Sequence, residues 1–475
     1  MLFNTFEFLV FFAISTLLFF TIKHKYRWLL LLLASCYFYM YFIPIYILIL
    51  FATIIIDYFA GIWIEKSDGI VRKRFLILSL ITNVGILAVF KYYNFFISNI
   101  NELLPSSSSH FNALSIILPV GLSFHTFQAM SYTIEVYRGN QKAERHFGIY
   151  ALYVMFYPQL VAGPIERPQN ILYQFYEEKK VEFDRIISGL KLILLGLVKK
   201  VIIADRLAIV VDEVYANPDS YTGIGFVIAA VFFSFQIYCD FSGYSDIAIG
   251  SAKVLGFDLM KNFKQPYFAK SISEFWTRWH ISLSTWFRDY LYIPLGGNRV
   301  SALRLSMNLL IVFMVSGFWH GANWTFIVWG GIHGVLIILS NSNKFNFKTP
   351  NILGYIWTFT MVTIAWVFFR AENLDVAIQY LSRMFAMSES SYFQLTKLDI
   401  HGLPSTYLGL PLWKFLLTCF LVPILLLSDY LVSKNSFIWL KKKPSIYSYL
   451  FYSLVVVSIF VFGVFETKQF IYFQF

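Results

Sequence analysis

Long apolar runs with few charges are the feature that most restricts how this chain folds. Residues 8–22, 28–64 and 75–97 consist mainly of aliphatic and aromatic side chains, and similar runs continue toward the end of the sequence. Only 14% of the residues are charged, whereas an ordinary soluble domain carries roughly 25%. Because a bilayer-spanning helix needs roughly 20 apolar residues, the sequence predicts an all-α polytopic membrane protein with about ten to twelve transmembrane helices.

The run at residues 28–64 is too long for one spanning helix, and it contains Pro44. Proline has no amide proton and clashes with the preceding helical turn, so Pro44 should divide the run into two helices joined by a tight turn. No repeat of roughly 20 to 50 residues and no long linker separates the chain into halves. We therefore predict a single membrane domain over residues 1–475.

Basic side chains gather in short connectors, for example at Lys23, Arg72 and Arg138. Such an excess marks the cytoplasmic side of a membrane, where residues 434–443 should also lie. Residues 103–112 contain no Lys or Arg and should lie on the opposite side. This arrangement predicts that both termini lie outside. The net charge of +11 then reflects basic connectors that set the orientation of the protein in the membrane. Membrane lipids are therefore expected as partners, and nucleic acid is not.

A less hydrophobic stretch near residues 271–289 has the pattern of a helix lying in the membrane plane. Ser271 and Glu274 have the spacing of a capping box, and large apolar side chains then recur on one helical face. The pattern predicts one continuous amphipathic helix with His280 one turn after Trp276. From spacing alone, His280 fits two roles equally well: assistance to proton transfer, or packing.

Residues 317–324 (Gly-Phe-Trp-His-Gly-Ala-Asn-Trp) place a histidine near the middle of an apolar run. An ionisable side chain at that depth is costly, which makes it a candidate functional group. A neutral imidazole accepts a proton from a hydroxyl group, so His320 is a candidate general base. Hydrogen-bonded packing between helices is the competing interpretation. Trp319 and Trp324 are predicted to wall a pocket around His320.

Two acids, Asp240 and Asp246, interrupt another apolar run. Carboxylates at that depth need partners, and Arg278 or a lysine such as Lys253 is the expected source of positive charge. For these acids, and for Asp205, a structural role is favoured over a catalytic one.

Several enzyme classes are excluded by their missing motifs. The sequence contains no G-x-S-x-G elbow, no phosphate-binding P-loop and no H-E-x-x-H zinc motif. His280, His320 and His333 are not three or four residues apart, and the three cysteines lie singly in apolar runs. No metal site is therefore expected.

At these blocks the sequence resembles the membrane-bound O-acyltransferase family (MBOAT), and within it the alginate O-acetyltransferase subfamily. The resembling segments are residues 118–125, 159–168, 239–250, 275–288, 317–324 and 470–475. The resemblance implies a ring of tilted transmembrane helices, with in-plane or re-entrant helices, around a central tunnel lined by histidines. It also matches His320 to the family's catalytic histidine and His280 to its second functional histidine, with Trp276, Trp319 and Trp324 in the same blocks.

The resemblance further implies a reaction. Family relatives take an acyl group from a cytoplasmic thioester and deliver it to the outer face of the inner membrane, so acetyl-CoA or another acyl thioester is the expected donor. A separate SGNH hydrolase-like acetyltransferase often completes the transfer, here to an extracytoplasmic polysaccharide. Two alternatives remain open: a D-alanyl transferase that serves teichoic acid, and a transporter or flippase that moves a polar substrate past the intramembrane acids and histidines.

The C-terminal tail at residues 470–475 (Phe-Ile-Tyr-Phe-Gln-Phe) is almost entirely apolar and aromatic. On composition alone such a tail is an interfacial anchor. In the D-alanyl branch of the family, a small partner ends in a similar motif whose tyrosine relays the acyl group. The resemblance therefore implies that Tyr472 is an acyl relay deprotonated by His320, which requires the tail to fold back into the site.

Overall fold

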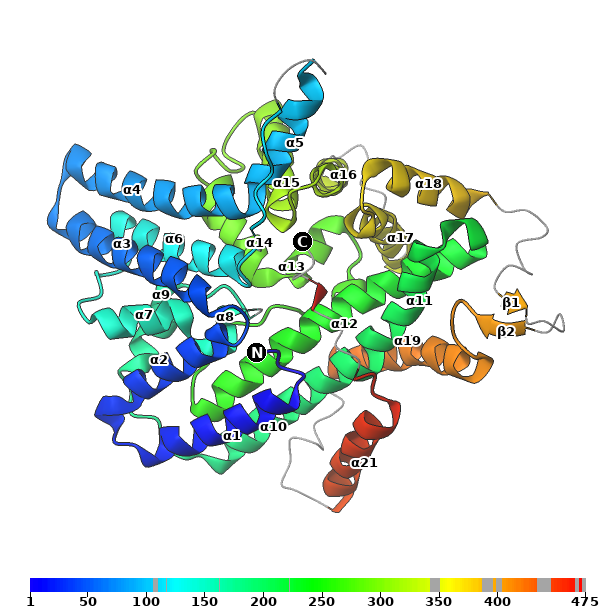
Figure 1. Ribbon diagram of the computed structural model, residues 1–475, viewed down its shortest axis with the longest axis horizontal. Helices are drawn as coiled ribbons and strands as arrows, with labels where there is room; N and C mark the ends of the chain where they lie inside the picture. Colours follow the sequence, from blue (N-terminus) through cyan, green and yellow to red (C-terminus); the bar gives the residue numbers. More distant parts are fainter. Residues whose placement is uncertain are drawn as a thin grey trace. The chain divides into compact units, whose positions relative to one another are not determined.

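The computed structural model describes residues 1–105, 110–116, 118–161, 163–221, 223–341, 351–386, 396–398, 404–433, 446–465 and 470–471. Tyr472 and the basic connector at residues 434–443 lie outside these ranges, as does part of the connector at residues 103–112. Among the described residues, the regular secondary structure is helical apart from one short hairpin, which confirms the all-α class (Figure 1).

The chain forms two compact units, each assembled from two separate stretches of sequence. One unit consists of Met1–Ile193 and Tyr244–Lys261, and the other consists of Leu194–Gly243 and Asn262–Phe475. The long helix α12 (Ile224–Leu255) contributes residues to both units. A single membrane domain over residues 1–475 stays a prediction.

The first unit begins with four long helices and continues with shorter ones. Its elements are α1 (Phe6–Thr21), α2 (His24–Met40), η1 (Pro44–Tyr46), α3 (Ile47–Lys66), α4 (Gly69–Leu87), η2 (Ala88–Tyr92), α5 (Tyr93–Leu103), α6 (Leu122–Arg138), α7 (Phe147–Met155), α8 (Tyr157–Leu160), α9 (Pro168–Ile171), η3 (Leu172–Phe175) and most of α10 (Phe183–Leu197). Pro44 divides the long apolar run, as predicted, and opens the 3-10 turn between α2 and α3. Proline fits there because the first amide of a helix has no carbonyl partner.

Three basic connectors lie together at one end of the first unit. The Arg72 guanidinium, at the start of α4, donates to the backbone oxygen of Tyr137 at 2.8 Å. His24 Nε2, at the start of α2, lies 3.2 Å from the backbone oxygen of Tyr176. The Tyr176 hydroxyl in turn donates to Glu144 at 2.6 Å, in the connector after α6. The connectors that were predicted to share the cytoplasmic side therefore share one end of this unit.

Glu166 is a buried acid of the first unit. Its Oε1 atom accepts a hydrogen bond from the Met260 backbone N–H at 2.5 Å, and its side chain is fully buried. Burial raises the pKa of the Glu166 carboxyl from 4.5 to about 7, although this hydrogen bond acts in the opposite direction. The folded protein therefore holds a proton between pH 4.5 and about 7 that the unfolded chain has lost.

The stability of the protein should accordingly fall as the pH rises through this window and then level off. We expect Glu166→Gln to remove that slope, so that the variant gains roughly 3 kcal/mol over the wild type between pH 4.5 and pH 8. Thermal unfolding of the detergent-solubilised proteins across this pH range measures the gain. The exposed Glu182→Gln change controls for loss of one negative charge, and parallel pH curves for Glu166→Gln and the wild type would contradict the expectation.

The second unit contains the remaining elements. They are η4 (Val198–Ala204), α11 (Asp205–Ala216), η5 (Pro218–Ser220), the first part of α12, η6 (Pro266–Phe268), α13 (Ile272–Arg278), α14 (Ile281–Phe287), η7 (Arg288–Tyr292), α15 (Ala302–His320), α16 (Trp324–Asn341), α17 (Asn351–Arg370), α18 (Leu374–Phe385), β1 (Thr396–Leu398), β2 (Pro404–Tyr407), α19 (Leu412–Ser433) and α21 (Ile446–Phe462). The two strands pair antiparallel. The segments η4 and η7 are π-helical turns, which are rare and occur frequently at functional sites.

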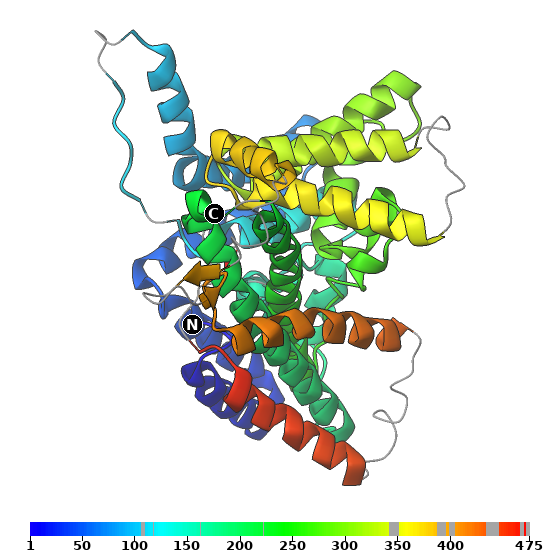
Figure 2. The same cartoon turned by 90° about the vertical axis from the view of Figure 1, so that its right-hand side faces the viewer.

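Helices α15 and α16 run side by side in the second unit (Figures 1 and 2). Their close approach depends on two glycines. A Cβ atom at Gly317 would lie 2.1 Å from the Phe326 carbonyl oxygen, and one at Gly330 would lie 2.2 Å from the Phe313 carbonyl oxygen. Both distances are far below van der Waals contact, so only glycine permits this crossing. The crossing fixes the end of α15, where His320 is the last residue.

Six helices among the described residues are long and apolar enough to cross a membrane: Pro44–Lys66, Gly69–Leu103, Ile224–Leu255, Ala302–His320, Ile352–Arg370 and Leu412–Ser433. Shorter apolar helices are Phe6–Thr21, Trp324–Ser340 and Ile446–Phe462. Large apolar side chains are exposed on them, as expected for a surface that faces lipid. The protein is therefore a multi-pass membrane protein, while the count of about ten to twelve spans and the central tunnel stay predictions.

Candidate active site

The segment that was predicted as one continuous in-plane helix near residues 271–289 forms two short helices instead. α13 ends at Arg278, α14 begins at Ile281, and His280 between them adopts a left-handed backbone with φ 43°. The cause is pairing with a distant loop. The Ile281 N–H donates to the backbone oxygen of Asn262 at 2.9 Å, and the Arg278 carbonyl accepts from Lys264 at 2.9 Å. These bonds replace the helical ones, so His280 does not follow Trp276 by one helical turn.

The start of α13 agrees with its predicted cap. The Ser271 hydroxyl oxygen accepts from the Glu274 N–H at 3.1 Å. The Glu274 carboxylate bonds back to the Lys270 N–H at 2.7 Å, one residue earlier than a capping box requires. The same carboxylate pairs with Arg278 at 2.6 Å. The positive charge of Arg278 is therefore paired with Glu274 of the same helix, α13.

His280 is fully buried, and its tautomer follows from its neighbours. Asn262 Oδ1 lies 3.1 Å from His280 Nδ1 and also accepts from the backbone N–H and the hydroxyl of Ser282. Because this atom accepts from a backbone N–H, it is the amide oxygen, and His280 Nδ1 must carry the proton. Burial lowers the pKa of His280 to about 3, so the ring stays neutral. Its Nε2 atom therefore carries a lone pair.

His320 is 3% exposed and ends α15 within a cage of aromatic rings. Its ring centroid lies 5.0 Å from that of Trp319, 5.2 Å from that of Trp329 and 5.5 Å from that of Phe369. The sequence predicted Trp319 in this role. Trp324, the other predicted wall, is 50% exposed and begins α16.

The two predicted histidines lie close together. The ring centroids of His280 and His320 are 6.4 Å apart, and Trp319 lies 6.4 Å from His280. The Phe241 ring of α12 contacts His280 edge-on at 4.5 Å. Two imidazoles from segments 40 residues apart thus meet in a buried aromatic site.

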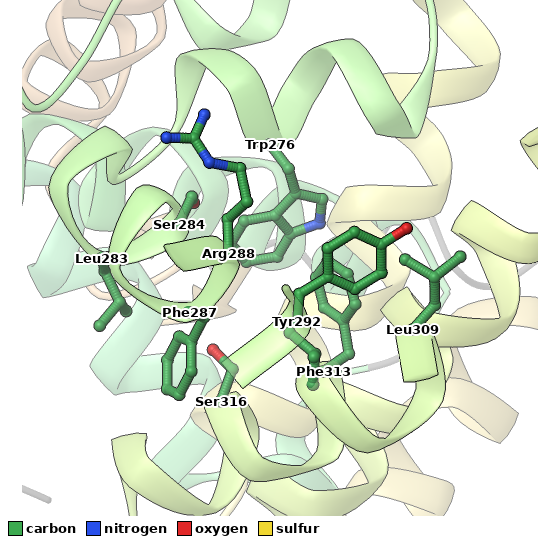
Figure 3. Close-up of a pocket in the computed structure, with 10 residues that line it drawn as sticks. Trp276, Leu283, Ser284, Phe287, Arg288, Tyr292, Leu309, Phe313 and Ser316 are labelled. Carbon is green, nitrogen blue, oxygen red and sulfur yellow. The ribbon is translucent and has the colours of Figure 1, made fainter. Parts of the chain in front are cut away.

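An apolar cavity of about 190 Å³ adjoins this site (Figure 3). Side chains from α13, α14, η7 and α15 line it, and Arg288 and Tyr292 come from the π-helical turn η7. One wall is the indole of Trp276, whose N–H donates to His333 Nδ1 at 3.3 Å. Trp276 also contacts Trp329, one of the rings around His320. Trp276 therefore links the wall of the cavity, through Trp329, to the cage of His320.

Asp240 belongs to a buried ion cluster. Lys200 Nζ of η4 lies 2.7 Å from Asp240 Oδ1 and 2.8 Å from Asp205 Oδ1. Burial disfavours the ammonium ion, but the carboxylates of Asp240 and Asp205 outweigh this effect and raise the pKa of Lys200. The partner of Asp240 is thus a lysine, but it is Lys200 and not the predicted example Lys253, whose ammonium donates to Ser188. Arg278 pairs with Glu274. Asp246 lies half-buried on the part of α12 that belongs to the first unit.

Sequence reasoning missed three groups of the site. Lys200 gave a signal, because it is a charged residue that precedes Asp205 within an apolar stretch. Asn262 and the contact between Trp276 and His333 gave none, because both depend on chain segments that are distant in sequence. Within the described ranges, no group of three or more His, Cys, Asp or Glu side chains is placed to hold a metal ion.

Comparison with known proteins identifies the family of this site. The model of the MBOAT, membrane-bound O-acyltransferase family matches residues 146–374, which include both His280 and His320. The chain is 40% identical over 405 residues to the probable alginate O-acetylase AlgI of Pseudomonas aeruginosa, a match that covers 84% of this chain and 77% of the relative.

Two further relatives differ in their named reactions. The peptidoglycan O-acetyltransferase of Helicobacter pylori is 40% identical over 399 residues, which cover 77% of this chain and 75% of the relative. The teichoic acid D-alanyltransferase of Streptococcus thermophilus is 31% identical over 251 residues, which cover 50% of this chain and 60% of the relative. The chain belongs to the membrane-bound O-acyltransferase family and is an O-acyltransferase.

Proposed function

We propose that the protein transfers an acetyl group from a cytoplasmic thioester, acetyl-CoA or another acyl thioester, across the inner membrane for the O-acetylation of an extracytoplasmic polysaccharide. The observation that carries this proposal is the meeting of His280 and His320, 6.4 Å apart, in a buried aromatic site. A D-alanyl transferase is the second candidate. Acetyl transfer is favoured because the acetyltransferase relatives share 40% identity over most of the chain. The D-alanyltransferase relative shares 31% identity over half of it.

In the proposed step, His320 removes the proton from the acceptor hydroxyl. The hydroxyl oxygen attacks the thioester carbonyl carbon at the same time. The carbon–sulfur bond then breaks, and the leaving thiolate takes the proton from the His320 imidazolium. A thioester already has a good leaving group, so one base and correct positioning suffice. His280 plays the supporting role, because its Nε2 lone pair accepts a hydrogen bond from the hydroxyl or from protonated His320.

Tyr472 is the proposed first acceptor of the acyl group. Two buried residues support it, since Phe470 and Ile471 immediately before it are 0% and 3% exposed. A phenol is more acidic than a sugar hydroxyl, and an aryl ester is a more activated acyl donor than an alkyl ester. The acyl group would pass from Tyr472 to a separate SGNH hydrolase-like protein and then to the polysaccharide.

The orientation proposed for the protein places both termini outside and the basic connectors in the cytoplasm. The support is that the connectors beginning at Lys23, Lys66 and Arg138 meet at one end of the first unit. Excess positive charge at one end of a membrane protein favours the cytoplasmic face. The thioester donor would then reach the site from the side on which it is made.

Membrane vesicles of known orientation test this function. We expect inverted vesicles, whose cytoplasmic face is outward, to release thiol from added acetyl-CoA or acetylated carrier protein, and sealed right-side-out vesicles to release none. A cysteine at position 72, in a cysteine-free background, reports orientation through labelling by an impermeant maleimide. Turnover only in right-side-out vesicles, or turnover of D-alanyl carrier protein alone, would reject the proposed donor.

A further inference from the structure

Three buried charges form a cluster of one cation and two carboxylates in the second unit. The side chains of Lys200, Asp205 and Asp240 are 1%, 4% and 5% exposed. Burying charges is costly unless each one is paired and hydrogen-bonded. Lys200 is paired with both carboxylates, and the second oxygen of Asp240 can accept a hydrogen bond from a further donor.

The C-terminal tail supplies that donor. The backbone N–H of Ile471 donates to Asp240 Oδ2 at 2.8 Å, while Asp240 Oδ1 faces Lys200. The neighbouring Phe470 is fully buried, and its ring lies 5.7 Å from that of Phe241. Phe241 is the ring that contacts His280. One carboxylate therefore joins the ion cluster to the tail, next to the histidine site.

The beginning of the tail is bound to the same region. After α21, the Val464 N–H donates to the backbone oxygen of Val201 at 2.9 Å, and Arg206 donates to the backbone oxygen of Phe462. Val201 lies in the π-helical turn η4, one residue after Lys200. The tail is thus held at two points. Where it leaves α21 it bonds to Val201 of η4, and at Ile471 it bonds to Asp240, the ion partner of Lys200 in η4.

Gly243 brings the partners of this cluster together. A Cβ atom at this position of α12 would lie 2.8 Å from the Gly196 carbonyl oxygen and 3.2 Å from the backbone nitrogen of Lys200. Because Gly243 has no side chain, α12 approaches η4 closely enough for Asp240 to reach Lys200.

We propose that Asp240 is a positioning residue, which Lys200 holds in place so that its second oxygen anchors the C-terminal tail at Ile471 beside His280 and His320. The inference rests on the proposed function, because the purpose of the anchor is to present the residue that follows Ile471 to the histidines. Only a carboxylate can pair with the Lys200 ammonium through one oxygen and accept the Ile471 N–H with the other. Asparagine has one oxygen, so its amide group would face either the ammonium of Lys200 or the N–H of Ile471, and both are donors.

The most direct test removes the tail's donor and leaves the charges intact. Ile471→Pro deletes the backbone N–H, and Ile471→Val keeps it with a nearly equal side chain. We expect the proline variant to transfer acyl groups roughly tenfold or more slowly than the valine variant, through a lower kcat at an unchanged KM for the thioester donor. We also expect carboxypeptidase to trim the tail of the proline variant faster, as followed by intact mass spectrometry. Equal trimming of the two variants would overturn the proposal.

A second pair of variants tests the carboxylate itself. Asp240→Asn should release the tail to carboxypeptidase, whereas Asp205→Asn, which breaks the other ion pair of Lys200, should leave it protected. Release by both variants, or by neither, would show that the cluster acts only as packing. The trimming assay does not depend on catalysis. If Tyr472→Phe retains full transfer while Ile471→Pro releases the tail, the relay is wrong and the anchor stands.

Discussion

His320→Ala is expected to lower acyl transfer at least about 100-fold, and up to about 10⁴-fold, which is the range for loss of a general base. The imidazole ends α15, and the close crossing of α15 and α16 at Gly317 and Gly330 holds it in place. Alanine is a good helix former at this position, so the variant should insert and fold. Thiol release and acetyl transfer by the purified variant measure the effect, and wild-type-like acetylation would refute the role of His320 as base.

The matched comparison is at His280, where the choice of substitution matters. Alanine would add backbone strain at φ 43°, whereas asparagine adopts the left-handed conformation more readily. His280→Asn is therefore expected to fold and to reduce turnover less than His320→Ala, because His280 supports the reaction and does not take the proton. Equal or reversed losses, measured side by side, would overturn this ranking.

Tyr472→Phe is the second change with a large expected effect. It keeps the aromatic ring and removes only the hydroxyl. If Tyr472 only anchors the tail at the membrane interface, the variant should stay active; if its hydroxyl relays the acyl group, the variant should lose activity. We expect transfer to the external acceptor to fall about 100-fold or more, since the residue proposed to form the covalent intermediate is lost. Mass spectrometry of the wild type with donor and no acceptor should then reveal an acyl adduct on Tyr472.

The control for this change is Tyr447→Phe, which removes an equivalent hydroxyl from the exposed surface of α21, where Tyr447 is 73% exposed. It should leave transfer unchanged. Normal acetylation of the external acceptor by Tyr472→Phe would instead make Tyr472 an interfacial anchor.

Much of the fold was predictable because hydrophobic runs and proline act locally. The division of the first long run at Pro44 and the cap at Ser271 follow from neighbouring residues. The interruption at His280 was not predictable. It depends on backbone bonds to Asn262 and Lys264, and no local pattern reveals that a loop 18 residues away will replace helical hydrogen bonds.

In the site, too, some residues could be predicted from the local sequence, and others depend on contacts with distant segments. His320 stood out as a candidate base from its place in an apolar run, and the resemblance singled out His280; both roles stay predictions. The partner of Asp240 was missed because two features bring Lys200 to it: a π-helical turn, and a glycine that lets α12 approach. Trp324 is half-exposed at the start of α16, and its role as a wall stays a prediction.

The assembly of each unit from two stretches of sequence has a consequence for recombination with relatives. A chimera with one junction at residue 193 would join the Met1–Ile193 stretch of one parent to the Tyr244–Lys261 stretch of the other, although both belong to the same unit. Exchanging Leu194–Gly243 together with Asn262–Phe475 keeps each unit from a single parent. Such an exchange places its junctions after residues 193, 243 and 261, one of them inside α12, and it moves His280, His320 and the Lys200 cluster as one block.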